Sequence, residues 1–326
     1  MKGAGNNMEY IILILGFILL IKGADYFVDG SSSVAKLLKI PAIVIGLTVV
    51  AFGTSMPEAS VSVTAALKGQ NGLAVSNVVG LNIFNLLIVL GMSALVNPIK
   101  AGVDVIKKEI PFSILTTLLL AVLCLRRNIA GGMAQMESFT LGRLDGAILL
   151  LLFVFYVGWE VKNALNGRTE NNEEDYKVLS PVLSAVFIIG GIIAIVYGGD
   201  LVVDSATVIA KNFGFDDTFI GLTVVALGTS LPELVTSVVA AKKGENELAL
   251  GNVIGSNIFN ILLILGASSF ICPITVGAVA IYDMLVLLGV SIFTYICVRN
   301  RKDINKLEGA IFLVIYAAYF IYIFNR

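Results

Sequence analysis

Apolar runs and short polar joins alternate along the whole chain. The runs are close to the roughly 20 residues that an α-helix needs to cross the hydrocarbon core of a bilayer, with allowance for tilt. The joins hold prolines, glycines, amides and charged residues, which are typical of helix ends and loops. The pattern predicts ten transmembrane helices, at residues 9–36, 42–67, 72–97, 109–126, 140–165, 180–211, 217–241, 246–271, 277–298 and 306–324.

Composition supports a membrane protein and removes several other classes. Of the 326 residues, 57% are hydrophobic and 14% are charged, which is more apolar surface than one soluble core can bury. We therefore predict an all-α polytopic membrane protein. The net charge of -1 provides no basic field for nucleic acid, and the absence of histidine removes the usual imidazole ligand of zinc or copper.

One polar join is more charged than the rest. Residues 166–178, NGRTENNEEDYKV, divide the ten predicted helices into two groups of five. We predict a first five-helix repeat at 1–165, an acidic cytoplasmic linker at 166–178 and a second five-helix repeat at 179–326. A regulatory cation site in the linker is the alternative to a solvated loop, but the segment is short and lacks an EF-hand spacing.

The two groups of helices are copies of one another. The stretch GLTVVAFGTSMPEASVSV, beginning at Gly46, returns as GLTVVALGTSLPELVTSV, beginning at Gly221, an offset of 175 residues. Residues 46–91 and 221–266 are identical at 30 of 46 positions. Because matched helices are five apart, an odd number, the second copy must cross the membrane in the opposite direction. This predicts an inverted-topology repeat, and such transporters bind their substrate where the copies meet.

The distribution of lysine and arginine predicts the orientation. Fourteen basic residues lie in or near the joins on the side of the acidic linker, and seven lie on the other side. The positive-inside rule places the linker in the cytoplasm and both termini outside. We expect an integral protein of the cell (inner) membrane.

Each copy carries one glutamate, Glu58 or Glu233, inside an apolar stretch in the context G-T-S-x-P-E. An ionisable residue at membrane depth is costly, which makes a functional role the first expectation. The threonine four residues earlier, Thr54 or Thr229, is expected on the same helix face. The intervening proline removes a backbone hydrogen bond and leaves carbonyl oxygens of the preceding turn available.

The next helix of each copy adds amide groups. Asn85 and Asn260 each lie two turns after another asparagine, and we expect each pair on one helix face. The copies differ here, because Ser256 continues the polar face in the second copy and Leu81 interrupts it in the first. Carboxylate, hydroxyl, carbonyl and amide oxygens, without nitrogen or sulfur, suit hard cations such as Ca2+, Na+ or Mg2+. The sequence therefore predicts a cation site and cation transport.

Other polar residues of the apolar segments are expected to have mainly structural roles. Interhelical hydrogen bonds are expected from Asn77, Asn82, Asn252 and Asn257. A structural or gate-lining role near helix ends is expected for the four aspartates that recur with the repeat, Asp25, Asp29, Asp200 and Asp204. Trp159 and Glu160 are expected at a membrane interface.

The pair of motifs G-T-S-[LM]-P-E and G-N-V-I-G-S-N-I-F-N resembles the alpha repeats of the sodium/calcium exchangers in the cation/calcium exchanger superfamily. The resemblance covers both halves through the repeat regions, and ten helices in two inverted groups of five is that family's architecture. It implies a four-cornered calcium site formed by Glu58, Glu233, Asn85 and Asn260. It also implies sodium ligands from Thr54, Ser55, Thr229, Ser230, Ser256 and the carbonyl groups of Ala51 and Ala226.

The resemblance also bears on the coupling ion. Proton-coupled members typically carry G-N-x-x-E where this chain has G-T-S-x-P-E, which favours sodium. Leu81 stands where the family pattern has a serine, so one sodium site is expected to be weak or missing. Asn260 stands where potassium-dependent relatives usually place an aspartate, so potassium dependence is not expected.

We therefore predict a secondary antiporter that exchanges Ca2+ for Na+ by alternating access, with membrane lipid around it and no organic cofactor. Its moving part is expected to be the peripheral helices, the first and sixth, across a core built from helices 2, 3, 7 and 8. No nucleic acid is expected as a partner. The sequence leaves protein partners and the oligomeric state open, and a monomer is one possibility.

Two further functions stay open. Within the transporter class, the alternative is Ca2+/H+ exchange in which Glu58 and Glu233 titrate. A cation channel is the alternative from another class, although inverted repeats around a closed polar centre argue against it. An enzyme is not expected, because the chain shows no nucleophile–base pair, nucleotide loop or metal-protease spacing.

Overall fold

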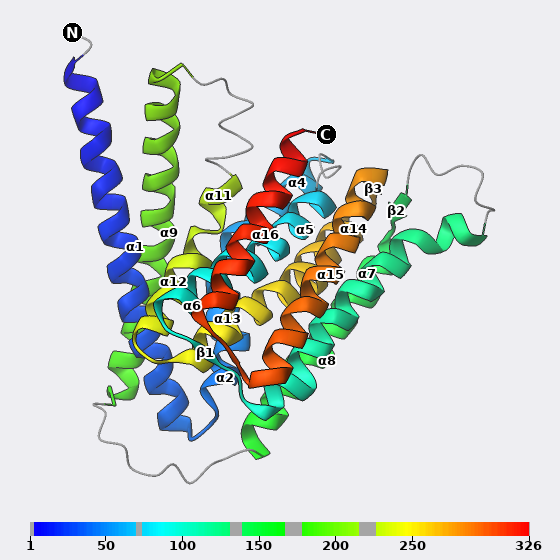
Figure 1. Cartoon of the computed structure of the whole chain (residues 1–326), viewed down its shortest axis with the longest axis horizontal. Coiled ribbons are helices and arrows are strands. Elements are labelled where there is room, and N and C mark those ends of the chain that lie inside the picture. The colour runs from blue at the N-terminus through cyan, green and yellow to red at the C-terminus, as the bar shows by residue number, and fades with distance from the viewer. Residues whose placement is uncertain (1–2, 70–73, 131–138, 167–177, 215–225, 326) are drawn as a thin grey trace.

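In the computed structural model, the described residues are 3–69, 74–130, 139–166, 178–214 and 226–325, and side chains are described for all of these except 3–7, 127–130, 166 and 226–227. Within these ranges the chain is almost entirely helical (Figure 1). Eight helices are long and apolar enough to cross a membrane, and one further span is a bent pair of helices. The predicted all-α polytopic membrane fold is confirmed.

The first half contains eleven helical elements, some of which run on directly from one another. They are α1 (Gly3–Leu38), α2 (Ala42–Ile45), η1 (Gly46–Val50), α3 (Ala51–Thr54), α4 (Met56–Leu67), α5 (Ala74–Phe84), η2 (Asn85–Val89), α6 (Leu90–Val96), η3 (Val105–Glu109), α7 (Ile110–Ala130) and α8 (Arg143–Asn166). Elements marked η are π-helical.

The second half repeats this order. Its described helices are α9 (Pro181–Asn212), α11 (Ala226–Thr229), α12 (Leu231–Lys242), α13 (Asn246–Phe259), η5 (Asn260–Leu265), α14 (Gly266–Ile271), α15 (Ala278–Arg301) and α16 (Lys306–Phe324). Two short antiparallel ladders join the halves, β1 (Ile99–Lys100) with β4 (Asp303–Ile304) and β2 (Phe139–Leu141) with β3 (Ile274–Val276). The predicted segment at 217–241 lies partly outside the described residues, and the predicted linker lies almost entirely outside them.

Elements that carry the repeated motifs begin 175 residues apart, as the sequence repeat requires, whereas α16 begins 163 residues after α8. Helix α12 begins at Leu231 against Met56 for α4, and η5 begins at Asn260 against Asn85 for η2. The N-terminal end of α1 and the C-terminal end of α16 lie at one end of the molecule, which we call the termini end (Figure 1). Helix α8 ends and α9 begins at the opposite end, which we call the linker end. That the linker end faces the cytoplasm stays a prediction.

The first helices of the two halves, α1 and α9, lie side by side at the edge of the molecule and run in opposite directions (Figure 1). Gly16 of α1 contacts Gly198 of α9, whereas Gly30, two turns from the end of α1, contacts Ser184 near the start of α9. A Cβ atom at Gly198 would lie 2.7 Å from the backbone nitrogen of Leu20. Glycines therefore allow the two backbones to approach closely, as is common between membrane helices.

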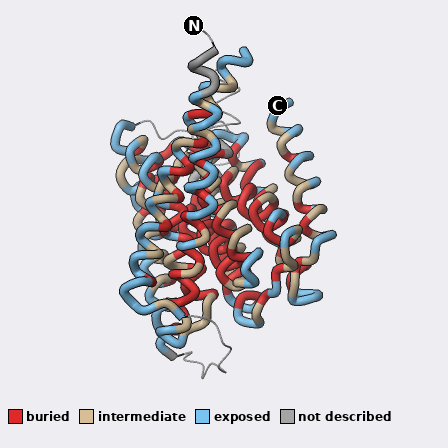
Figure 2. Tube along the Cα trace, turned by 90° about the vertical axis from the view of Figure 1, so that its left-hand side faces the viewer, coloured by how far each residue is buried: buried red, intermediate tan, exposed pale blue. Residues whose placement is uncertain are grey.

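The core of the molecule is formed by the helices that carry the predicted site. The span from Asn246 to Ile271 is 94% buried and the span from Ala74 to Val96 is 78% buried, whereas α1 is 33% buried and α16 is 17% buried. Figure 2 shows the buried positions gathered at the centre and the exposed positions on the outer helices. The site therefore lies among helices surrounded by protein, and the outer helices separate it from lipid.

The predicted helix at 42–67 is broken rather than continuous. Helix α3 ends at Thr54, α4 begins at Met56, and the two parts are bent by 51°. Pro57 lies in the first turn of α4, where its missing N–H is tolerated. The expectation that Thr54 and Glu58 share one helix face is therefore wrong, because they lie on either side of the break. The second copy breaks at the matched residue, Ser230, between α11 and α12.

Candidate functional site

The four residues expected to form a calcium site are all buried in the core. Glu58 lies in the first turn of α4 and Glu233 in the first turn of α12. Asn85 begins η2 and Asn260 begins η5. None of the four side chains is more than 4% exposed. Helix α4 packs against η5, and α12 packs against η2, so each glutamate helix meets the asparagine segment of the other copy.

Local backbone structure explains how each residue is presented. The helix break at Ser55 or Ser230 makes the following glutamate part of a new helix N-terminus, where the backbone dipole favours negative charge. Asn85 and Asn260 each open a π-helical segment, a rare widening of the helix that is frequent at functional sites. Sequence reasoning missed both π-helical segments.

One oxygen of each of the four residues has no hydrogen-bond partner among the described residues and is shielded from solvent. These atoms are Glu58 Oε2, Glu233 Oε2, Asn85 Oδ1 and Asn260 Oδ1. A buried polar atom without a partner costs about 1–3 kcal/mol, so four such atoms on four matched residues call for an explanation. Two carboxylate and two amide oxygens form a donor set that a hard cation would satisfy.

Two further asparagines hold the amide groups in this orientation. Asn85 Nδ2 donates to Asn257 Oδ1 at 3.1 Å, and Asn260 Nδ2 donates to Asn82 Oδ1 at 3.0 Å. Asn82 and Asn257 also donate to each other's backbone carbonyl groups, at 3.1 and 3.3 Å. Because the nitrogen of Asn85 or Asn260 is engaged, its oxygen is left available. The interhelical hydrogen bonds predicted for Asn82 and Asn257 are confirmed, and their reciprocity reflects the matched halves.

Hydroxyl groups of the first copy surround Glu233. Ser55 Oγ donates to Glu233 Oε1 at 3.0 Å and lies 3.1 Å from Ser256 Oγ. Thr54 Oγ1 lies 2.9 Å from Asn252 Oδ1 and 3.3 Å from the carbonyl oxygen of Ala51. The expected sodium ligands Thr54, Ser55, Ser256 and Ala51 are thus brought together on this side of the site.

Asn252 supports the same cluster from α13. It is fully buried, and Asn252 Nδ2 donates to Ser237 Oγ at 2.9 Å and to the carbonyl oxygen of Glu233 at 3.3 Å. Its predicted interhelical role is confirmed. Its counterpart Asn77 is exposed while Asn85 is buried, and that these two residues share one helix face stays a prediction.

The matching side of the site, near Glu58, is less complete in the described residues. Ser230 is buried, and Thr229 is half-buried and has an interaction partner. Leu81, which replaces the serine found at 256, is buried and supplies no oxygen. Ala226 begins α11, and its side chain lies outside the described residues. Within the described ranges, no cluster of three acidic, histidine or cysteine side chains could hold a metal, so neutral oxygens must complete the donor set.

Comparisons with known proteins identify the family of the chain. The sequence model of the family described as sodium/calcium exchanger protein matches residues 8–162 and 183–325. Sodium/calcium exchanger MaX1 of Methanosarcina acetivorans is 32% identical over 354 residues, which cover 98% of this chain and 99% of MaX1. Inner membrane protein YrbG of Escherichia coli is 36% identical over 311 residues, which cover 92% of each chain.

A solved structure has the same fold. The sodium-calcium exchanger NCX_Mj, soaked with zero Na+ and Ca2+, matches with a TM-score of 0.82 and 34% sequence identity. The match covers 96% of this chain and 98% of that chain. With similarity along nearly the whole sequence and the whole fold, the chain belongs to the sodium/calcium exchanger protein family of membrane transporters.

Proposed function

We propose that this chain is a secondary antiporter that exchanges Ca2+ for Na+ by alternating access, and that Glu58, Glu233, Asn85 and Asn260 coordinate the Ca2+. The observation that carries the proposal is the set of four buried oxygens without hydrogen-bond partners, one from each residue. Two ionised carboxylates balance the charge of one Ca2+, and the two amide oxygens add neutral ligands of the type that Ca2+ accepts.

Sodium would use the flanking oxygens and the same carboxylates. On the side of Glu233, the hydroxyl groups of Thr54, Ser55 and Ser256 and the carbonyl group of Ala51 supply a set of hard donors. On the side of Glu58, the proposed donors are Thr229, Ser230 and the carbonyl group of Ala226. Because Na+ and Ca2+ would share the two glutamates, occupancy by one ion excludes the other, and exchange follows.

The test is uptake of radioactive calcium into proteoliposomes that contain the full chain. Vesicles are loaded with sodium, potassium or choline, and uptake is measured at two pH values. We expect uptake only from sodium-loaded vesicles, and we expect Glu58→Gln and Glu233→Gln each to abolish it, because one Ca2+ then faces a single carboxylate. Glu9→Gln, which removes a half-buried glutamate near the start of α1, is the matched control and should retain uptake.

Other outcomes would reassign the function. Uptake that ignores sodium and follows a pH gradient would indicate Ca2+/H+ exchange with the same glutamates. Uptake that needs no counter-ion would indicate a channel. Full sodium-dependent uptake in both glutamine variants would remove Glu58 and Glu233 from the site.

A further inference from the structure

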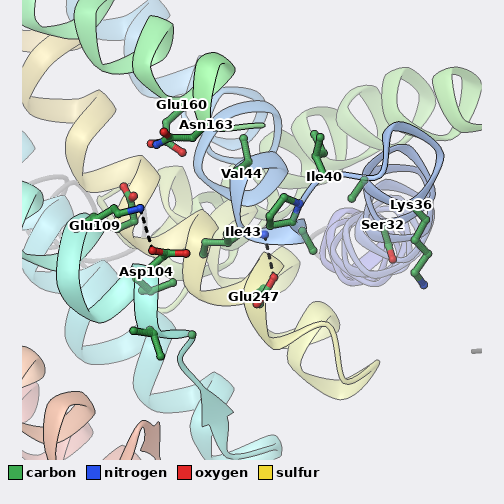
Figure 3. Close-up of a pocket in the computed structure, with 17 residues that line it drawn as sticks. Ser32, Lys36, Ile40, Ile43, Val44, Asp104, Glu109, Glu160, Asn163 and Glu247 are labelled. Carbon is green, nitrogen blue, oxygen red and sulfur yellow. Dashed lines mark hydrogen bonds and ion pairs between the residues drawn. The ribbon is translucent and has the colours of Figure 1, made fainter. Parts of the chain in front are cut away.

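A cavity of about 720 Å³ opens at the linker end of the molecule, separate from the four-cornered site. The last turns of α1, the short helix α2, the π-helical segment η3, the last turns of α8 and the first turn of α13 contribute to its walls (Figure 3). Two buried carboxylates that the proposed transport mechanism does not use, Glu109 and Glu160, line this cavity.

Glu160 differs from its expected position at a membrane interface. The neighbouring Trp159 is 47% exposed, as an interface residue can be, but Glu160 is only 2% exposed. Glu160 Oε1 is shielded from solvent and has no hydrogen-bond partner among the described residues. Glu109, the last residue of η3, is 6% exposed. In Figure 3 the carboxyl groups of Glu109 and Glu160 lie at the same corner of the cavity.

The charge of this corner is not balanced by protein groups. The two carboxylates are close enough to repel each other, and their direct partners are neutral, the hydroxyl group of Tyr156 at 3.4 Å from Glu109 Oε2 and the amide of Asn163 beside Glu160. Lys108 acts electrostatically on both carboxylates but pairs with Asp104 at 2.9 Å, so these four groups together keep a net negative charge. A buried pair of like charges without a bound cation is unfavourable, and it needs a positive partner or a proton.

The pair belongs to the first half alone. The position matched to Glu109 at the offset of 175 is Met284, which is buried and apolar, and the one acidic residue of α16, the helix matched to α8, is Glu308 in its first turn. The residues of the transport site, by contrast, are duplicated in both halves. A role outside the symmetric transport cycle is therefore the simpler explanation for these two acids.

We propose that Glu109 and Glu160 form an accessory site for a divalent cation, completed by the side-chain oxygens of Asn163 and Tyr156. Two carboxylates match a charge of two, and the remaining donors are hard oxygens, so the site suits Ca2+ and disfavours soft transition metals. The neighbouring cavity supplies the entry path and room for water ligands.

Trp159 provides a specific reporter, because it is the only tryptophan of the chain. With Glu109 and Glu160 it lines a second, smaller cavity of about 290 Å³. The experiment adds Tb3+ to the purified full-length chain in detergent and records Tb3+ luminescence under excitation selective for tryptophan. Ca2+ is then added as the competitor.

The transport site is silenced by measuring in the Glu58→Gln/Glu233→Gln background. We expect saturable luminescence that Ca2+ displaces in this background, and an affinity weaker by about tenfold or more when Glu109→Gln and Glu160→Gln are added. Asn163→Asp, which adds a carboxylate, should tighten Tb3+ binding and guards against a loss caused only by misfolding. The signal survives a failure of the proposed transport function, since it does not depend on uptake.

Two outcomes would overturn the accessory site. One is an identical Tb3+ titration with and without Glu109 and Glu160. The other is tryptophan fluorescence that responds to pH but not to Ca2+ or Tb3+, which would mean that the two acids share a proton instead of a metal ion.

Discussion

Helices α13 and α5 occupy matched positions in the two copies, and among the described residues they differ in how closely the opposite copy covers them. A Cβ atom at Gly255 of α13 would lie 2.7 Å from Ala51 Cβ and from the carbonyl oxygen of Leu47. At the matched Gly80 of α5, a Cβ atom would meet none of the described groups within 4 Å, and the residue matched to Leu47 lies in the range 215–225, outside the described residues. Two nearly identical sequences therefore lie in different environments, and local sequence alone cannot be the cause.

The polar residues of the two helices differ in burial in the same way. Asn252 near the start of α13 is fully buried, whereas Asn77 near the start of α5 is exposed. Helix α13 starts toward the linker end, and α5 starts toward the termini end (Figure 1). In the proposed alternating-access cycle, a buried Asn252 and an exposed Asn77 would fit a state that is closed toward the linker end and open toward the termini end.

An ion-pair cluster shows the same asymmetry. Lys243 Nζ lies 2.7 Å from Asp25 Oδ1, 2.7 Å from Asp29 Oδ1 and 2.8 Å from the carbonyl oxygen of Asp25, so the end of α12 is tied to α1. The residues matched to these three, at the offset of 175, are Lys68, Asp200 and Asp204. All three are exposed, and the described structure pairs Lys68 with neither aspartate. The recurring aspartates expected to line a gate thus hold α1 on the closed side only.

The largest expected effect is on stability, and it comes from replacing Gly255 by alanine, with the same replacement at the matched Gly80 for comparison. Gly255→Ala should destabilise the protein by about 1–3 kcal/mol, because the new Cβ meets backbone and Cβ atoms that cannot move freely. Gly80→Ala, the matched control, should leave thermal stability unchanged or raise it by up to about 1 kcal/mol, because a glycine in a helix interior is replaced without a clash. Thermal unfolding in detergent measures both.

Calcium exchange by the same two glycine variants provides a further test. If α5 is covered in the opposite state as α13 is covered here, Gly80→Ala should slow calcium exchange despite its normal stability. Equal stability loss in both variants would contradict the difference in packing. Normal exchange in Gly80→Ala would contradict the interpretation of the two states.

A second comparison concerns the oxygen that the first copy lacks. Leu81→Ser should strengthen the sodium dependence of calcium uptake by about fivefold, the effect of one added polar interaction of about 1 kcal/mol. Ser256→Ala removes the corresponding hydroxyl group, which lies 3.1 Å from Ser55 Oγ. This variant should weaken the sodium dependence of calcium uptake by a similar factor. The measurement is uptake against internal sodium concentration. An unchanged sodium curve in Leu81→Ser would remove the account of Leu81 as a lost ligand.

The smallest effect is expected from the lysines. Lys243→Ala should release α1 from the closed side and shift the population away from the present state by about fivefold, since partly exposed ion pairs contribute about 1 kcal/mol or less each. Lys68→Ala, the matched control, removes a lysine that makes no such pair here. The readout is labelling of Asn77→Cys by a membrane-impermeant thiol reagent, in a background with Cys272→Ser because the other two cysteines are buried.

Labelling at position 77 should slow in Lys243→Ala and should not slow in Lys68→Ala. A faster rate in Lys243→Ala, or equal changes in both variants, would show that the cluster does not hold the present state.

Many features of this protein follow from its local sequence. The spans are visible because a helix that faces lipid needs about 20 apolar residues, whatever its neighbours are. Glu58 and Glu233 stand out because a charge at membrane depth is costly wherever the helix packs. The duplication at an offset of 175 predicts that the two halves run in opposite directions, since five is an odd number of crossings.

The tertiary structure decided how these residues are used. The orientation of the Asn85 and Asn260 amides depends on Asn257 and Asn82, which come from the opposite half of the chain. The accessory pair joins Glu109 of η3 to Glu160 of α8, and neither residue carries a motif.

The asymmetry between α13 and α5 is the clearest case. The two helices are similar in sequence, yet Asn252 is buried and Asn77 is exposed, because burial is set by the elements packed against each segment. Sequence by itself determined most of the spans, the repeat and which four residues form the proposed four-cornered site. Only the contacts between the halves decided which oxygens are left without partners and which side of the protein is closed, because those contacts join residues distant along the chain.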